Sequence, residues 1–289
     1  MKFNKRYRLT VQVDDAGNSV EIDYPLTCEF NIIRTIFSGA NTGKFTIYNL
    51  GEDTRNKIFH DLYDPKTIRK LTFQAGYADQ NPLPIAFQGR VQVAYSTRKG
   101  VNWVTEIKAF DADLDSQTAQ AVPAGTSIRD TIGRLMGNLL HASKGTVGNF
   151  PVKSETGASY AGNTWSIISS VAQDNGGTAF IDNGVAHVLK PGEYAAEIPN
   201  ASPIISGATG LLRVQMQFKS RVDVEIMLDT NRAIGQLVQL QSEVEQNNGN
   251  YVVKGVSHRG VISGAKDSET ITLLNLQNGT GAIPAGLMV

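Results

Sequence analysis

The alternation of apolar and polar side chains predicts most of the secondary structure in the first part of the chain. From Tyr7 to Val13 every second residue is apolar, which is typical of a β-strand with one buried face. Similar strands are predicted at residues 30–32, 45–47, 71–75, 87–95 and 101–107. Residues 51–59 have acidic side chains first and cationic ones later, which favours a short helix. The segment 1–113 is therefore predicted to form a small β-barrel with one helix.

Helical spacing replaces this alternation between residues 114 and 205. Apolar residues recur at helical intervals from Ile128 to Leu140 and predict one amphipathic helix. A second helix is predicted to begin at Thr164 and to end at a Gly-Gly pair. Two short strands follow, joined by an Asp-Asn-Gly turn at residues 182–184. This middle segment is predicted to be a small α/β domain.

Strand patterns return in the last part of the chain, from residue 206 to residue 289. Strands are predicted at residues 212–218, 222–226, 237–240, 251–256 and 270–273. The final hairpin, 251–273, faintly resembles the segment 88–109, which indicates a weak internal duplication. The predicted fold class is mainly β, with two related β-barrels and an α/β insertion between them.

The charge balance excludes a general electrostatic attraction to nucleic acid or to anionic membranes. Lys and Arg together number 27, and so do Asp and Glu, so partners must be recognised by shape or by local patches. The single cysteine, Cys28, lies in an apolar run and predicts a buried side chain without any disulfide framework. No run of 18 apolar residues and no secretory leader pattern occur, so membrane insertion is not expected.

Glu52, Asp61 and Thr67 are the strongest candidates for catalysis, because their spacing is similar to the catalytic set of phage-type lysozymes. Two carboxylates beside a glycosidic bond are what such hydrolysis requires. The surrounding sequence differs, since residues 54–60 lack the Gly-rich hairpin of those enzymes. We therefore interpret these residues as an exposed helix face and loop.

Other motifs also fail to predict a catalytic, cofactor-binding or metal site. The segment Asp111-Ala112-Asp113-Leu114-Asp115 begins like a calcium loop, but Ser116 and Val122 occupy positions that require Gly and a bidentate acid. Trp103 and Trp165 lie in apolar patterns that predict core positions. The four histidines are far apart in sequence and are interpreted as structural: His60, His141, His187 and His258. The sequence thus predicts an assembly protein that is not an enzyme and needs no cofactor.

Four short motifs carry a resemblance to a known family. They are FTIYNLGEDTRNKI at 45–58, QGRV at 88–91, IKAFDA at 107–112 and YVVKGVSHRG at 251–260. The first resembles the signature of phage tail hub proteins, and the others are similar to late-control-D-like baseplate hubs of contractile-tailed bacteriophages. The resemblance implies two tube-protein-like barrels, 1–113 and 206–289, flanking an inserted α/β domain, 114–205.

The same resemblance implies a function and a set of partners. Such hubs form trimers whose six similar barrels adapt a threefold central spike to a sixfold tail tube. Further partners would be the tube or tube-initiator protein, surrounding baseplate proteins and the tape-measure protein in the lumen, without sequence-specific nucleic-acid binding. The protein would belong to the virion tail baseplate after assembly in the host bacterial cytoplasm.

Two alternatives to the hub remain open from the sequence. One is a β-sandwich module that binds carbohydrate or a host surface, and the other is a lysozyme-like hydrolase that uses Glu52 and Asp61. The apolar tail, 281–289, is compatible with docking on a partner and equally with a frayed terminus.

Overall fold

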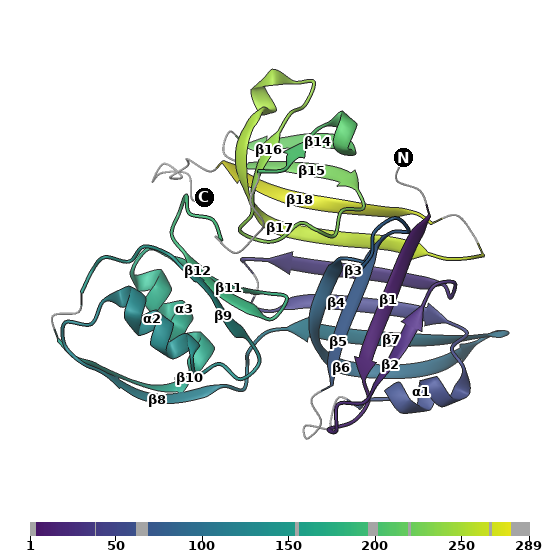
Figure 1. Cartoon of the computed structure of the whole chain (residues 1–289), viewed down its shortest axis with the longest axis horizontal. Helices are drawn as coiled ribbons and strands as arrows, with labels where there is room; N and C mark the ends of the chain where they lie inside the picture. The colour runs from purple at the N-terminus through teal and green to yellow at the C-terminus, as the bar shows by residue number, and fades with distance from the viewer. Residues whose placement is uncertain are drawn as a thin grey trace.

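The computed structural model describes residues 4–37, 39–61, 69–153, 156–195, 202–218, 221–265 and 268–278. The chain is arranged in three parts, which we call the N-terminal β unit, the inserted unit and the C-terminal β unit. Figure 1 shows the N-terminal β unit at the lower right, the inserted unit at the lower left and the C-terminal β unit above them. Strands make up most of the elements in all the described ranges, and α2 and α3 both belong to the inserted unit. The molecule is therefore mainly β, as predicted.

The N-terminal β unit consists of strands and one short helix. Its elements are β1 (Lys5–Gln12), β2 (Ser19–Asp23), β3 (Cys28–Thr35), β4 (Asn41–Tyr48), α1 (Glu52–Ile58), β5 (Lys70–Tyr77), β6 (Ile85–Lys99) and β7 (Asn102–Asp111). The alternation that predicted these strands is also the burial pattern, because Tyr7, Leu9 and Val11 of β1 are buried between more exposed neighbours. The predicted strands and helix of this segment are confirmed.

The inserted unit combines two helices with short strands. Its elements are β8 (Gln117–Val122), α2 (Ile128–Met136), β9 (Ser143–Val147), β10 (Ala158–Asn163), α3 (Thr164–Asp174), β11 (Thr178–Asp182) and β12 (Val185–Leu189). Ser127 and Asn163 cap the two helices, since each side chain accepts a hydrogen bond from a first-turn backbone N–H. The helices pack against each other and bury one core with the β11-β12-β9 sheet.

The C-terminal β unit returns to strands. Its elements are β13 (Ile204–Ile205), η1 (Gly207–Thr209), β14 (Leu211–Phe218), β15 (Arg221–Met227), β16 (Leu237–Leu240), η2 (Glu245–Asn247), β17 (Gly249–Ile262) and β18 (Thr270–Asn278). The strands predicted for this segment are confirmed. Its core also contains Phe180, Leu189 and Ala195, which follow the helices of the inserted unit in the chain, so the two parts share buried surface.

The strands of both β units form one sheet of 13 strands within the described residues. The order is β14-β15-β18-β17-β3-β4-β7-β6-β5-β1-β2; off this path, β16 pairs with β17 and β13 pairs with β16. The two units join where β17 pairs antiparallel with β3, from Gly255 opposite Thr35 to Ile262 opposite Cys28. The sequence pattern did not predict this junction.

The two β units share one strand order. In the N-terminal β unit the order β3-β4-β7-β6-β5 follows antiparallel pairing, and in the C-terminal β unit β14-β15-β18-β17-β16 repeats it strand for strand. The long hairpin of each unit also has a bulge in its first strand, near Gln92 in β6 and near Lys254 in β17. The repeat extends the faint sequence similarity of the two hairpins and supports an internal duplication.

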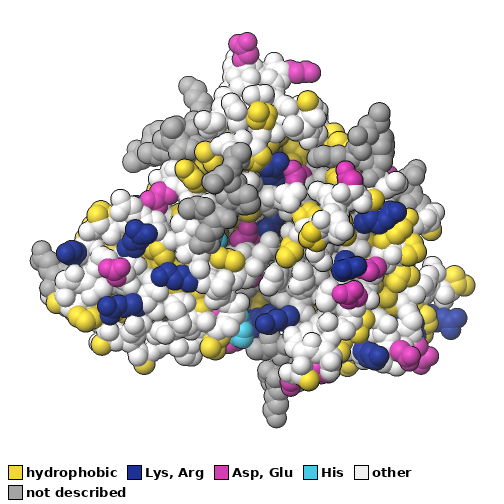
Figure 2. All heavy atoms as spheres, viewed as in Figure 1, with side chains coloured by type: hydrophobic (Ala, Val, Ile, Leu, Met, Phe, Trp, Pro, Cys, Tyr) yellow, Lys and Arg dark blue, Asp and Glu magenta, His cyan; other side chains and the backbone are white. Residues whose placement is uncertain are grey.

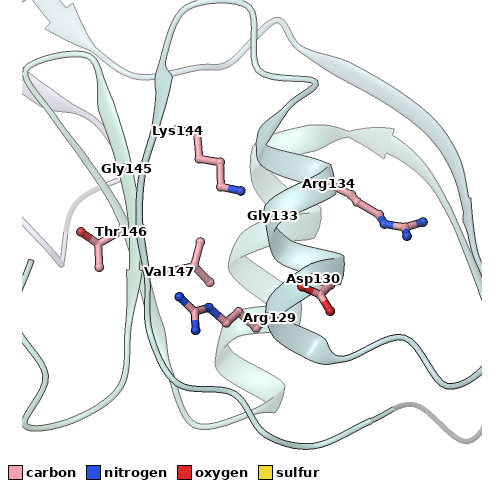
Figure 3. A pocket seen from close by; sticks show the side chains of 8 residues that line it. All are labelled: Arg129, Asp130, Gly133, Arg134, Lys144, Gly145, Thr146 and Val147. Carbon is pink, nitrogen blue, oxygen red and sulfur yellow. The ribbon is translucent and has the colours of Figure 1, made fainter. Parts of the chain in front are cut away.

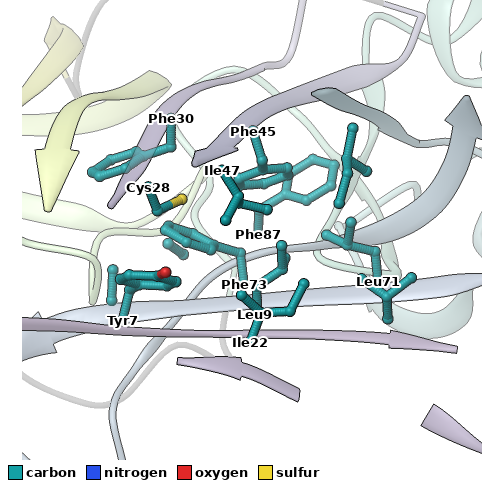
Figure 4. Packing of buried hydrophobic residues seen from close by; sticks show 14 of the residues in the cluster. Tyr7, Leu9, Ile22, Cys28, Phe30, Phe45, Ile47, Leu71, Phe73 and Phe87 are labelled. Atoms are coloured by element: carbon teal, nitrogen blue, oxygen red, sulfur yellow. The ribbon is translucent and has the colours of Figure 1, made fainter. Parts of the chain in front are cut away.

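The core of the N-terminal β unit is built around aromatic rings. Figure 4 shows Phe73 between Tyr7, Phe30 and Phe45, with Phe87 nearby. The ring centroid of Phe73 lies 4.8 Å from that of Phe45 and 5.1 Å from that of Phe30. Cys28 is buried in the same cluster, as predicted from its apolar run. These rings fill the space enclosed by strands that are distant in sequence.

Several sequence predictions are corrected by the structure. Helix α2 ends at Met136, followed by Gly137, so Leu140 lies outside the helix and is exposed. Strands β2, β8, β9, β10 and β13 were not predicted. Trp165 is buried as expected, but Trp103 is 37% exposed and was wrongly assigned to the core. None of the described helices is long and apolar enough to cross a membrane.

Candidate assembly interface

The outward face of the sheet is continuous across the two β units. On β3, Phe30 and Ile32 point into the core, which leaves Asn31 and Ile33 on the opposite face. Arg259 of β17 lies directly opposite Asn31 across the junction. A cleft of about 390 Å³ lies at this junction, lined by Glu29, Phe30, Asn31, Arg259, Gly260, Val261, Glu269, Thr270 and Ile271. The face therefore carries mixed charge and some apolar surface, which suits contact with other proteins.

Gly260 allows the backbones of β17 and β18 to approach closely beside this junction. Its φ is 152°, and a Cβ at this position would collide with the backbone carbonyl oxygen of Glu269. Because β17 pairs with β3 on one side and β18 on the other, a side chain here would push β17 away from β18. Gly260 therefore keeps β17 paired with β18 at the place where β17 also pairs with β3.

A buried ion pair lies beneath the junction. Arg34 is at an inward-facing position of β3, and its Nη1 lies 2.9 Å from Oδ1 of Asp182 at the end of β11. The two side chains are 1% and 6% exposed. Arg34 Nη2 also donates to the carbonyl oxygen of Arg232 at 2.6 Å, and Asp182 Oδ2 accepts from Ile234 N at 3.1 Å. The pair therefore connects all three parts of the chain.

The turn between β11 and β12 is held by the N-terminal β unit. Gly184 N donates to Asp111 Oδ1 at 3.1 Å, and Asn183 Oδ1 accepts from Gln88 N at 3.0 Å. Asn41 Nδ2 donates to the carbonyl oxygen of Ile181 at 2.7 Å. Asn183 has a φ of 51° and Gly184 a φ of 75°, which is the backbone that the predicted Asp-Asn-Gly turn requires. These bonds fix the inserted unit against β4, β6 and β7.

Burial changes the pKa of His258, which lies beside the Arg34–Asp182 ion pair. Burial lowers the pKa of His258 well below its ordinary value, and the nearby Arg34 guanidinium lowers it further. His258 is therefore neutral near pH 7. Its Nδ1 lies 2.9 Å from Thr272 Oγ1 and its Nε2 lies 3.4 Å from Arg34 Nη2. A ring that donates from Nδ1 and accepts at Nε2 fits both contacts.

Asp111→Asn is expected to flatten the pH dependence of stability. Burial, and then the Asp182 carboxylate, raise the pKa of Asp111 from 3.8 to about 7. The stabilisation from a carboxyl of this kind is complete below pH 3.8 and is lost as the pH rises to about 7, at a total cost of about 2–4 kcal/mol. The amide keeps the acceptor for Gly184 N but cannot ionise. Urea unfolding at several pH values between about 5 and 8 measures the slope.

Asp14→Asn is the matched control for this measurement. Hydrogen bonds from Asn18 lower the pKa of Asp14, so its titration lies below the pH range of the experiment. The control should keep the wild-type slope. A wild-type slope in Asp111→Asn as well would contradict an ionisation of Asp111 in this range.

The residues considered for hydrolysis are found at and after helix α1 of the N-terminal β unit. Glu52 and Asp61 are exposed, at the start of α1 and beyond its end. Thr67 lies outside the described residues. Trp103 is partly exposed and has the Arg55 guanidinium 4.1 Å above its ring centroid, so one face of the ring is covered.

The acidic residues that resemble a calcium loop have other partners. Asp113 is buried and accepts hydrogen bonds from Ser116 and from His141 N. Asp115 pairs with Arg90 at 2.7 Å. No group of three or more His, Cys, Asp or Glu side chains in the described ranges is placed to hold a metal ion. This segment connects β7 to the inserted unit.

The four histidines lie in different parts of the molecule. His60 bridges to Ala94 of β6 through the backbone, His187 accepts from Thr146 N, and His258 lies beside Arg34. His141 lies 3.6 Å from Asp115, and burial lowers its pKa. Each contact shown here is with the surrounding structure.

Comparison with known proteins identifies the family. The model of the family described as baseplate hub gp41 matches residues 6–259, which is most of the chain. The chain belongs to the baseplate hub gp41 family. The predicted relation to phage tail hubs is thereby confirmed, and this hub protein has a structural role in a phage tail baseplate. No curated protein matches the sequence.

Solved structures show the same fold as this hub at low sequence identity. A tail protein from Neisseria meningitidis MC58 aligns with a TM-score of 0.59 and 11% identity over 96% of this chain and 97% of that one. The 43 kDa tail protein of prophage MuSo2 from Shewanella oneidensis gives 0.59 and 8%, with the same coverage. A half-lidded Francisella PdpA-VgrG complex gives 0.57 and 9% over 97% of this chain and 59% of that one.

Sequence reasoning missed the ion pair that joins the three parts of the hub. One signal was present, because Arg34 occupies the buried phase of the alternation that includes Phe30 and Ile32. A cation at a buried position requires an anionic partner. The partner, Asp182, is 148 residues away, and no local pattern indicates it.

Proposed function

We propose that three copies of this chain form a ring that adapts a threefold central spike to a sixfold tail tube in a contractile phage tail. The observation that carries the proposal is the repeated strand order of the two β units. Three copies then present six similar β units around one axis, which matches a sixfold partner while the ring itself has threefold symmetry. On this proposal each β unit acts as a tube-protein-like barrel, flanking the inserted α/β domain.

Free strand edges offer the contacts that such a ring needs. Strand β14 is at one end of the sheet order, and the last part of β6, Tyr95–Lys99, pairs only with β7 among the described strands. Unpaired strand edges are templates for pairing with another chain. Pairing of β14 of one copy with β6 of the next would continue the sheet from copy to copy. The outward face would then line a lumen for the tape-measure protein and later DNA.

The proposed partners follow from the two ends of such a ring. One end would bind the spike and the other the tube or tube-initiator protein, with baseplate proteins outside. The similarity to a chain in a PdpA-VgrG complex supports a spike-bound role. Assembly would take place in the host cytoplasm before the hub is built into the virion. The apolar tail, 281–289, lies outside the described residues, and docking on a partner remains a proposal for it.

Native mass spectrometry of the full chain tests the ring. We expect trimers, either from the chain alone or after co-expression with the spike protein of the same phage. Negative-stain images of the trimer should show an open centre. A chain that stays monomeric under both conditions would overturn the proposal.

Leu212→Asp is expected to weaken the trimer by at least about tenfold, because it places a charge on the free edge of β14. Leu212 is 55% exposed within the chain, so the monomer should retain its thermal midpoint. Phe59→Asp is the matched control, since Phe59 is 57% exposed after α1 and away from this edge. Sedimentation equilibrium measures both trimer affinities. Equal affinities in the two variants and the wild type would show that β14 is not a ring contact.

A further inference from the structure

A basic cleft lies on the inserted unit, although the whole chain has no net charge. It lies between α2 and β9, has a volume of about 550 Å³ and is lined by Arg129, Asp130, Gly133, Arg134, Lys144, Gly145, Thr146 and Val147. Figure 3 shows Arg129 and Lys144 reaching into the space between the helix and the strand, with the apolar Val147 between them. The cleft is within the range of roughly 300–1,000 Å³ that is usual for binding clefts.

The amphipathic pattern of α2 produces one wall of this cleft. Ile132, Leu135 and Met136 are buried against the inserted unit, which leaves Arg129 and Arg134 on the exposed side. Gly133 provides room for Lys144, because a Cβ at Gly133 would lie 3.0 Å from Lys144 Nζ. A glycine at this position therefore lets the cation cross over the helix.

The cations of the cleft have no ion-pair partner in the described part of the chain. Arg129, Arg134 and Lys144 are exposed, and no carboxylate of the described residues lies within ion-pair distance of them. The one acid in the lining, Asp130, accepts a hydrogen bond from Ser127 Oγ at 2.7 Å. Three cations against one acid leave a local positive charge. Figure 2 shows dark blue side chains gathered over the inserted unit on the viewed face.

An exposed acidic tip lies on the C-terminal β unit, between β16 and β17. Glu243, Val244 and Glu245 are all exposed, and neither glutamate forms an ion pair with a described residue. Figures 1 and 2 show this part of the chain projecting at the top, with magenta acidic side chains at its end. An acidic pair with an apolar residue between its members is complementary to the cleft.

The acidic tip is held in shape by its own hydrogen bonds. Ser242 Oγ donates to the carbonyl oxygen of Val244 at 2.9 Å, and Ser242 N donates to Asn248 Oδ1 at 2.6 Å. Tyr251 Oη donates to the carbonyl oxygen of Asn247 at 2.9 Å. A segment that is already ordered loses less conformational entropy when it binds. The tip therefore has the properties of a docking element.

We infer that the acidic tip of one copy, residues 243–245, docks in the basic cleft of the neighbouring copy. The inference rests on the proposed ring and adds a specific contact to it. The tip and the cleft are different surfaces of one chain, and a contact between unlike surfaces generates a closed ring when the rotation between copies is suitable. Glu243 and Glu245 would meet Arg129 and Lys144, while Val244 would lie against Val147. Opposite charges would also select the correct neighbour during assembly.

Charge reversal with rescue tests the contact. The cleft variant is Arg129→Glu with Lys144→Glu, the tip variant is Glu243→Lys with Glu245→Lys, and the combined variant carries all four changes. The cleft variant and the tip variant should each weaken the trimer affinity by about tenfold or more, as measured by sedimentation equilibrium in about 0.05 M NaCl. The combined variant should recover most of the wild-type affinity, because each contact again joins opposite charges. In about 0.5 M NaCl the differences should shrink.

The outcomes of this experiment distinguish a failure of the proposed ring from a failure of the contact between tip and cleft. A wild-type chain that forms no trimer, either alone or after co-expression with the spike protein, overturns the proposed function and this inference together. A wild-type trimer with unchanged affinity in the cleft and tip variants overturns the inference alone. Weakening without recovery in the combined variant also overturns it, because the cleft then binds something other than the tip. Circular dichroism of the four proteins should show the same fold, since all substituted residues are exposed.

Nucleic acid is the other class of ligand that a basic cleft can bind. A fluorescent single-stranded oligonucleotide is therefore added to the wild type and to the cleft variant. We expect no difference between them in anisotropy. Oligonucleotide binding that is lost in the cleft variant, with an unchanged trimer, would assign the cleft to a phosphate backbone and overturn the inference.

Discussion

Replacing Arg34 with alanine is expected to lower the free energy of unfolding by about 3–5 kcal/mol. The guanidinium is buried and lies 2.9 Å from the Asp182 carboxylate. Its removal leaves Asp182 buried without its cation and the carbonyl oxygen of Arg232 without this donor. The loss should be large because both groups remain away from water in the folded state. Urea unfolding followed by tryptophan fluorescence measures it.

Two further variants show whether the pair itself is responsible. Arg34→Met combined with Asp182→Leu removes both charges and should recover most of the stability, because apolar residues of similar size can replace a buried ion pair. Arg8→Ala breaks an exposed pair with Asp23 and should leave the unfolding midpoint nearly unchanged. A loss in Arg34→Ala no larger than that in Arg8→Ala would contradict the role of the buried pair.

Phe73→Ala is expected to destabilise the protein by a similar amount, about 3–5 kcal/mol. Phe73 is fully buried, and its ring contacts those of Tyr7, Phe30 and Phe45. The smaller side chain leaves a cavity that strands paired on both sides cannot close. The same urea experiment, with the slope of the transition unchanged, gives the difference in stability.

Phe37→Ala provides the control for the loss of a phenyl ring. Phe37 is largely exposed after β3, so its removal should change the stability by no more than about 0.5 kcal/mol. If Phe73→Ala and Phe37→Ala lowered the free energy of unfolding by similar amounts, burial of the Phe73 ring would not explain the stability of the N-terminal β unit.

Local patterns predicted the strands of both β units because alternation is a property of consecutive residues. In β1, β3 and β4 the buried residues are those that the period of two places on one face. The same reasoning missed β8 and β10, whose sequences QTAQAV and ASYAGN are short, small and polar. Their pairing with each other stabilises them, and that pairing is not visible in either segment alone.

Two errors in the core assignment have a similar cause. Leu140 continues the apolar spacing of α2, but the helix ends before it and Leu140 N donates to Ser116 Oγ instead. Trp103 fits the alternation of β7, yet it lies at the start of the strand beneath the Arg55 guanidinium and is partly exposed. In both cases a contact with a residue distant in sequence decides where the side chain lies.

The sequence by itself determined the mainly β character, the helices of the inserted unit and, through four short motifs, the relation to phage tail hubs. These properties depend on neighbouring residues or on motifs within one element. Only the tertiary structure decided that β17 joins β3 in one sheet, that Arg34 pairs with Asp182, and that the two units share a strand order. It also placed the basic cleft and the acidic tip on separate surfaces, because charges distant in sequence combine into patches only when the chain is folded.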